Sequence, residues 1–114
     1  MTIYHIALRS DWTEAVAAGE YHVSTRGRTV EQVGFIHAST ATQVDGVANA
    51  FYADAEDPLV LVIDPDKLTA PLRYDLVPGA DEPFPHIYGP LNLDAVTGTT
   101  ELRRDADGRY AFEA

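Results

Sequence analysis

The run Leu59-Val60-Leu61-Val62-Ile63 is apolar at every position. A strand with one face in water alternates apolar and polar residues, whereas a strand covered on both faces reads as a continuous apolar run. We therefore expect residues 59–63 to form a central strand of a β-sheet. The run is also the longest apolar stretch in the chain, and it is much too short to cross a bilayer, which takes about 20 apolar residues.

Residues 2–8 have the period of a second strand. Tyr4, Ile6 and Leu8 fall on one face and the residues between them on the other. Because both faces are largely apolar, this strand is also expected to be interior. His5, in its middle, is then at least partly covered.

Two helices are expected. The first begins after a cap at Ser10 or Asp11 and ends at Gly19. The second follows the strand expected at residues 33–39 and begins with a capping box formed by Thr40 and Gln43. Its buried stripe has the i, i+3, i+4, i+7, i+8 spacing and consists of Val44, Val47, Ala48, Phe51 and Tyr52.

The remaining elements are short strands separated by turns. The Asp-Gly step at the end of the turn 105–108 predicts a C-terminal hairpin over residues 99–112. We expect roughly five to seven strands, which with two helices make a small mixed α+β domain with a mainly antiparallel sheet. The 114 residues suffice for a single domain, 1–114. No glycine-rich loop of the dinucleotide-binding type follows a strand.

The stretch Phe84-Pro85-His86-Ile87-Tyr88-Gly89-Pro90-Leu91 combines rigidity with reactive groups. Pro85 and Pro90 restrict the backbone at both ends, because proline locks its own φ and pushes the preceding residue toward extended conformations. The rigid segment presents His86 and Tyr88. The stretch is interpreted either as one wall of a functional site or as a stiff connection into a buried strand.

The net charge of −10 and the lack of cysteine exclude several classes of function. An acidic protein repels nucleic acid and anionic membranes, so we expect neither as a partner. Disulfides and cysteine metal sites are ruled out. Arg26 and Arg28 form a small basic spot suited to a small anionic ligand. The first residues show no secretion signal, so a cytoplasmic location is expected.

Three of the four histidines, His5, His37 and His86, are carried on separate extended segments. Imidazole is the commonest general acid–base group and metal ligand, so we expect a shared site. The alternative is that each is a hydrogen-bonded core or surface histidine. Zinc could be held by the three with Asp75, but no spacing typical of a zinc site is present and no metal is expected. Ser39 lies outside any nucleophile-elbow motif.

Two blocks, Gly34-Phe35-Ile36-His37-Ala38-Ser39 and the stretch 84–91, carry a resemblance to a known family, together with Ile3-Tyr4-His5-Ile6 and Leu59 to Ile63. On these residues, the chain resembles the bacterial domain of unknown function 952 over residues 3–96. It departs from the family pattern at two positions where glutamate is usual. At the first position the chain has Val33, which has no carboxylate. At the second it has Asp75, which keeps the carboxylate on a side chain shorter than that of glutamate.

The resemblance implies a split β-sheet similar to that of ADP-ribosyltransferases, which holds NAD in a cleft. It implies His5 at the site from the first strand, and His37 with Ser39 from the second. For the third position the candidates are Asp75, His86 and Tyr88. In such chemistry a carboxylate stabilises positive charge that develops on the ribose, as in glycoside hydrolysis.

The function expected from the resemblance is binding of NAD or an ADP-ribose-like nucleotide, with ADP-ribosyl transfer or NAD glycohydrolysis as a further step. Tyr88 would stack on the nicotinamide, and Arg26 or Arg28 would hold the pyrophosphate. No cofactor is required, and NAD would be substrate or ligand. The alternative is a non-catalytic regulatory module that binds a metabolite or a protein.

Overall fold

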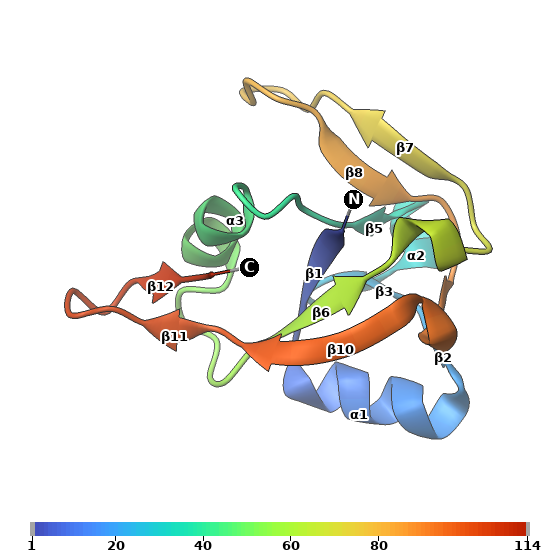
Figure 1. The fold of residues 1–114 in the computed structure, drawn as a ribbon, viewed down its shortest axis with the longest axis horizontal. Coiled ribbons are helices and arrows are strands. Elements are labelled where there is room, and N and C mark those ends of the chain that lie inside the picture. Colours follow the sequence, from blue (N-terminus) through green and yellow to red (C-terminus); the bar gives the residue numbers. More distant parts are fainter. Residues whose placement is uncertain (1, 114) are drawn as a thin grey trace.

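The computed structural model describes residues 2–113 as two three-stranded antiparallel sheets and three two-stranded ribbons, with helices around them (Figure 1). The first sheet has the order β1-β6-β10, with β1 at Ile3–Ala7, β6 at Leu59–Ile63 and β10 at Val96–Glu101. The prediction of a central strand at residues 59–63 is confirmed. Leu61, in the middle of β6, is fully buried, and burying such a side chain contributes roughly 1.5–3 kcal/mol to folding.

The second sheet has the order β5-β8-β7 and carries polar groups on one face. Its strands are β5 at Ile36–His37, β8 at Phe84–Ile87 and β7 at Leu72–Asp75. The register places His86 opposite both His37 and Arg73, so these three side chains form a row across one face. The neighbouring register positions, Ile36, Ile87 and Leu72, contribute to the core on the other face.

Among the described residues, the two sheets are joined at one bridge, between Tyr4 of β1 and Ser39, just after β5. The Tyr4 N–H donates to the Ser39 carbonyl at 2.8 Å, and the Ser39 N–H donates to the Tyr4 carbonyl at 2.7 Å. The strands separate beyond this pair, so the sheet is split, as expected. The α+β class and mainly antiparallel pairing are confirmed, while the likeness to ADP-ribosyltransferases stays an expectation.

The helices differ in detail from those expected. They are α1 at Arg9–Ala18, α2 at Val30–Val33 and α3 at Val44–Phe51, with two 3₁₀ turns, η1 at Pro65–Lys67 and η2 at Leu93–Ala95. The predicted cap of α1 was wrong, because Leu8 occupies the N-cap position without a side-chain bond. The short helix α2 occupies the start of the strand expected at residues 33–39.

The predicted start of α3 was also early. Gln43 occupies the N-cap position, and its side chain accepts the Thr40 N–H, so the predicted capping box instead closes a turn before the helix. A complete capping box does exist, at α2, where Thr29 and Gln32 bond each other's backbone N–H groups.

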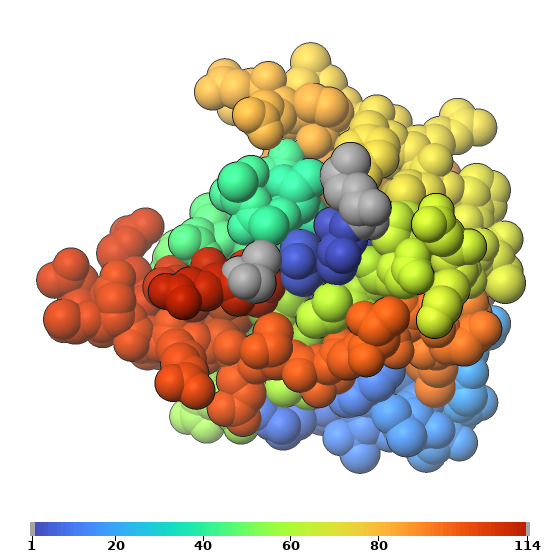
Figure 2. All heavy atoms as spheres, in the orientation of Figure 1, coloured from blue at the N-terminus to red at the C-terminus, as the bar shows by residue number. Residues whose placement is uncertain are grey.

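The remaining strands form two-residue or three-residue ribbons. They are β2 at Glu20–Tyr21 with β9 at Leu91–Asn92, β3 at Val23–Thr25 with β4 at Arg28–Thr29, and β11 at Arg103–Arg104 with β12 at Tyr110–Ala111. The terminal hairpin is therefore shorter than residues 99–112, because residues 99–101 belong to β10. Figure 2 shows this hairpin projecting at the left of the molecule.

Side chains of β1 contribute to two cores, one on each face of the first sheet. Ile3 and Ala7 belong to the core that includes α1, and Tyr4 and Ile6 belong to the core that includes α3. This alternation is what a strand covered on both faces requires. Within residues 2–113, no helix has the length and apolar character needed to cross a membrane.

Candidate functional site

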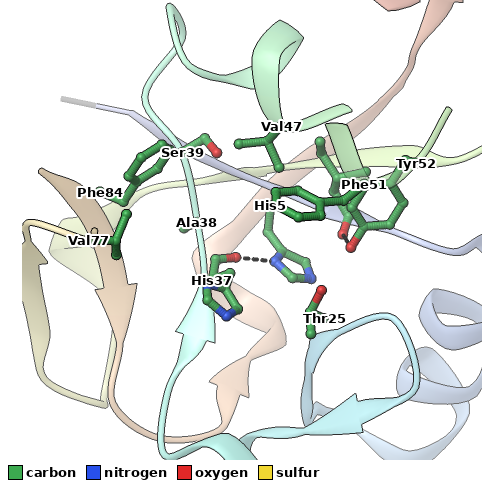
Figure 3. Close-up of a pocket in the computed structure, with 11 residues that line it drawn as sticks. His5, Thr25, His37, Ala38, Ser39, Val47, Phe51, Tyr52, Val77 and Phe84 are labelled. Atoms are coloured by element: carbon green, nitrogen blue, oxygen red, sulfur yellow. Dashed lines mark hydrogen bonds between the residues drawn. The ribbon is translucent and has the colours of Figure 1, made fainter. Parts of the chain in front are cut away.

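A pocket of about 410 Å³ opens beside the Tyr4–Ser39 bridge, where the two sheets separate (Figure 3). Its apolar wall residues are Ile6, Ala38, Val47, Phe51, Tyr52, Val77 and Phe84, and its polar ones are His5, Thr25, His37 and Ser39. Phe84 and Val77 lie on one side, and Val47, Phe51 and Tyr52 lie on the other. Both sheets and α3 thus build the pocket.

His5 lies at the base of the pocket and is held at both ring nitrogens. Its Nδ1 lies 2.5 Å from the carbonyl oxygen of His37, and its Nε2 lies 2.8 Å from the Tyr21 hydroxyl. A carbonyl oxygen only accepts, so Nδ1 carries the proton and Nε2 accepts from the Tyr21 hydroxyl. The ring therefore has a defined tautomer and no nitrogen left for a ligand.

Burial keeps both His5 and Tyr21 neutral. Burial lowers the pKa of His5 to about 4; the bond to the His37 carbonyl acts in the opposite direction, and the nearby His37 ring adds to the lowering. Burial likewise raises the pKa of Tyr21, with the Asp11 charge adding to this effect. The pair exchanges no proton near neutral pH, so its role is to support the pocket.

His37 and His86 meet on the polar face of the second sheet. Their rings lie edge to face with centroids 5.3 Å apart, and Phe35 stacks on His86 at 4.0 Å with 19° between the planes. His86 is buried, whereas His37 reaches the surface and lines the pocket. Burial, and then the neighbouring His86, lower the pKa of His37. His37 is therefore neutral at physiological pH.

Asp75 binds two of the other predicted residues. Its Oδ2 accepts from the Tyr88 hydroxyl at 2.5 Å and from His86 Nδ1 at 2.8 Å. The Tyr88 bond first, and then the His86 bond, lower the pKa of Asp75. The same contact with Asp75 raises the pKa of Tyr88. Asp75 is thus an ionised carboxylate beside a neutral phenol.

The structure therefore divides the predicted site residues between two adjoining places. His5 and Ser39 lie in the pocket, and Asp75, His86 and Tyr88 form a cluster next to it. His37 belongs to both, since it lines the pocket and contacts His86. Asp75 is close to the pocket as well, because its register partner in β8, Phe84, is one of the wall residues.

The two arginines are not equivalent. Arg26 pairs with Asp54 at 2.7 Å, donates to the Phe51 carbonyl at 3.1 Å and lies over the Tyr52 ring. These contacts put it at the pocket rim, near Phe51 and Tyr52. Arg28 is exposed on β4, and its side chain makes no hydrogen bond or ion pair with any residue in the part of the chain described.

The aromatic wall of the pocket carries no functional motif in the sequence. Phe51 was expected in the buried stripe of the second helix, but its side chain is 66% exposed. It is the last residue of α3, where the stripe has passed the core and reaches the lip of the pocket. For Phe84, the only feature of the sequence that pointed to a role in the site was its position at the start of the proline-containing stretch 84–91.

Among residues 2–113, no group of three or more His, Asp or Glu side chains is arranged to hold a metal ion. The zinc alternative from the sequence needed His5 as a ligand. Both of its nitrogens are occupied by Tyr21 and by the His37 carbonyl, so this ligand set does not assemble.

Comparison with known proteins gives a family and a fold. The model of the family described as "Protein of unknown function (DUF952)" matches residues 6–99. The crystal structure of protein CC0527 from Caulobacter crescentus is 30% identical, with 97% of this chain and 94% of that chain covered and a TM-score of 0.83. The solution structure of CC0527 is 31% identical, covering 95% and 90% of the two chains, with a TM-score of 0.76. No curated protein matches.

Proposed function

We propose, on the premise that the chain belongs to the family of proteins of unknown function DUF952, that its pocket binds the flat heteroaromatic ring of an NAD-like or ADP-ribose-like nucleotide. The observation that carries the proposal is the composition of the pocket wall: aromatic side chains on both sides and a few polar side chains among them. A volume of about 410 Å³ is within the usual range of small-molecule sites.

The polar groups suit the edge of a heteroaromatic ring. Ser39 and Thr25 each carry a hydroxyl that can donate or accept, and His37 carries a neutral imidazole that can do the same. A nicotinamide carboxamide or an adenine edge needs both donors and acceptors. Phe51 and Phe84, on opposite sides of the pocket, supply aromatic surface for the ring itself.

The charges assign the phosphates to the rim. None of the residues that line the pocket is lysine or arginine, so a phosphate would enter without a cationic partner. Arg26 is the guanidinium nearest to Phe51 and Tyr52, and it already has a carboxylate partner in Asp54. A pyrophosphate at the rim would compete with Asp54 for Arg26.

Asp75 provides the carboxylate that cleavage of a ribosyl bond needs. Its lowered pKa keeps it ionised, and its register partner Phe84 is in the pocket wall. A negative charge there would stabilise an oxocarbenium-like transition state. Transfer or hydrolysis of the ribosyl group is therefore the catalytic extension of the binding proposal.

One observation favours the second candidate, a module that binds its ligand without turning it over. Two of the polar groups in or beside the pocket are already engaged inside the protein: His5 at both nitrogens and Asp75 Oδ2 with two donors. Groups held in this way shape a site but have less freedom to react. Catalysis would then require Asp75 to act through its other oxygen.

The two candidates separate in one experiment. ¹⁵N-labelled protein is titrated with NAD, ADP-ribose and nicotinamide up to millimolar concentration, and the same samples are analysed for free nicotinamide. Binding is expected to shift the amide resonances of Thr25, Ser39 and Phe51. Shifts with release of nicotinamide support the enzyme, and shifts without release support the module. If none of the three compounds shifts these resonances, the nucleotide proposal is wrong.

A further inference from the structure

The two buried histidines of the site use their ring nitrogens differently. Both nitrogens of His5 are bonded within the protein. His86 is bonded at Nδ1 by Asp75, and its Nε2 makes no hydrogen bond with any residue in the described range 2–113. This asymmetry distinguishes a group that can react from one that supports the fold.

The tautomer of His86 follows from its partner. Asp75 is ionised, since its pKa is lowered by Tyr88 and His86, and an ionised carboxylate only accepts hydrogen bonds. The proton therefore lies on His86 Nδ1. In the neutral ring Nε2 then carries the lone pair, which is the form that a proton acceptor needs.

The Nε2 atom is also the place where His86 meets solvent. His86 is only 2% exposed, yet over residues 2–113 no fully buried side-chain nitrogen or oxygen is left without a hydrogen-bond partner. Because Nε2 has no such partner, it cannot be one of the fully buried atoms. Water or a small ligand can reach it.

The orientation of the ring is fixed by its neighbours. Phe35 covers one face of His86 at 4.0 Å, and the His37 ring stands edge-on at 5.3 Å. The Tyr88 hydroxyl in turn orients the Asp75 carboxylate with a 2.5 Å bond. A histidine base oriented by a carboxylate through Nδ1–H is an arrangement found in many acid–base sites.

We propose that His86 is a proton-transfer residue of this site, acting at Nε2, with Asp75 and Tyr88 as its positioning residues. This role rests on the proposed function, because the hydroxyl or water that gives up the proton belongs to the ligand bound in the neighbouring pocket. The sequence analysis offered Asp75, His86 and Tyr88 as three candidates for one position. The structure makes them three parts of one unit.

The step is a single proton transfer. The O–H bond of a ligand hydroxyl or of a water molecule breaks, an N–H bond forms at His86 Nε2, and the oxygen keeps the electron pair. The imidazolium that results faces the Asp75 carboxylate through Nδ1–H, which compensates its charge. His37 stays neutral because its pKa is lowered, so it adds no positive charge to that of Arg73, which lies opposite His86 in the register.

The first test is the tautomer of His86, read from long-range ¹H–¹⁵N spectra of the imidazole rings at neutral pH. We expect the proton on Nδ1 and the lone pair on Nε2. The D75E variant should keep this tautomer because it retains a carboxylate, and D75A should lose it. A parent protein with the proton on Nε2, or a D75A spectrum identical to that of the parent, would overturn the proposal.

The second test asks whether Nε2 is reachable. Diethyl pyrocarbonate acylates an imidazole nitrogen that carries a lone pair, and peptide mapping identifies the modified ring. We expect His86 to be labelled while His5 is not, since His5 Nε2 accepts from Tyr21 in the core. Labelling of the surface residue His22 without His86 would overturn the proposal. Neither test requires a nucleotide, so a failure of nucleotide binding is distinguished from a failure of this assignment.

Discussion

His5 donates its Nδ1 proton to the carbonyl oxygen of His37, and this 2.5 Å hydrogen bond crosses the gap where the two sheets separate. One residue earlier, Tyr4 and Ser39 exchange the only backbone bridge that the described residues form between the sheets. The side chain of His5 thus extends the connection by one step beyond the backbone pairing. It holds the base of the pocket and leaves His37 free to face outward.

Removal of the Tyr21 hydroxyl should weaken the fold. In Y21F the lone pair of His5 Nε2 loses its donor in a site closed to water, and an unsatisfied buried acceptor costs about 1–3 kcal/mol. Urea denaturation measures the loss. Y88F is the matched control and should lose less, because its hydroxyl is partly exposed. Equal stability of Y21F and the parent would show that His5 does not depend on Tyr21.

The stability of the protein should fall as the pH drops from about 6.5 to about 4, in part because of His5. The folded state keeps His5 neutral down to pH about 4, whereas the unfolded chain binds a proton below about 6.5. The unfolded state therefore holds more protons in this window, and the total effect is about 3 kcal/mol. The stability is fully present above pH 6.5.

The test compares the pH dependence of the unfolding free energy in the parent and in H5Q, where this part of the slope should vanish. H22Q is the control, because His22 contributes to the pH dependence of stability with the opposite sign. Its partners, Glu31 and then Glu20, raise the pKa of His22, so its contribution is present at low pH and lost as the pH rises through the raised value. An H5Q slope equal to that of the parent would contradict the assignment.

The close approach at Gly89 should be sensitive to one methyl group. The backbone there has φ of +159°, and an added Cβ would lie 2.9 Å from Ala70 Cβ. Overpacking of this kind costs about 1–3 kcal/mol, so G89A should be destabilised by that amount. The double variant A70G/G89A should recover part of the loss. G98A is the control, since no atom lies within 4 Å of its added Cβ.

Phe51 should matter for binding and little for folding. Its side chain is 66% exposed, so F51A should change stability by less than about 0.5 kcal/mol. If Phe51 forms the lip over a bound ring, NAD affinity should fall about tenfold, which corresponds to about 1.4 kcal/mol. V16A, which truncates another exposed apolar residue, should leave affinity unchanged. Calorimetric titration of both variants with NAD tests the nucleotide proposal at this wall.

Arg26 and Arg28 should differ in their effect on phosphate-containing ligands. Arg26 donates to the carbonyl of Phe51, a residue of the pocket wall, whereas the exposed Arg28 side chain has no such contact among the described residues. We expect R26A to weaken ADP-ribose binding and R28A to leave it unchanged, with nicotinamide binding unaffected in both. D54N should strengthen ADP-ribose binding, because it removes the carboxylate that competes for Arg26. The opposite ranking of the two arginine variants would place the phosphates elsewhere.

Local pattern predicted the parts of the fold that depend on neighbouring residues. The apolar run 59–63 became the central strand β6, and the stripe of the second helix became the buried face of α3 over Val44 and Ala48. The errors lie at element ends. Phe51 left the stripe there, and α1 began without the expected cap, because tertiary contacts decide where a helix stops and starts.

The sequence by itself determined the kind of protein: an acidic α+β chain with a covered central strand, two family blocks, and three histidines on extended segments. Only the tertiary structure decided what each histidine does. His5, His37 and His86 come together through strand register and through the Tyr4–Ser39 bridge. Which ring nitrogen finds a partner depends on residues such as Tyr21 and Asp75, distant in the chain, and burial then decides which ring stays neutral.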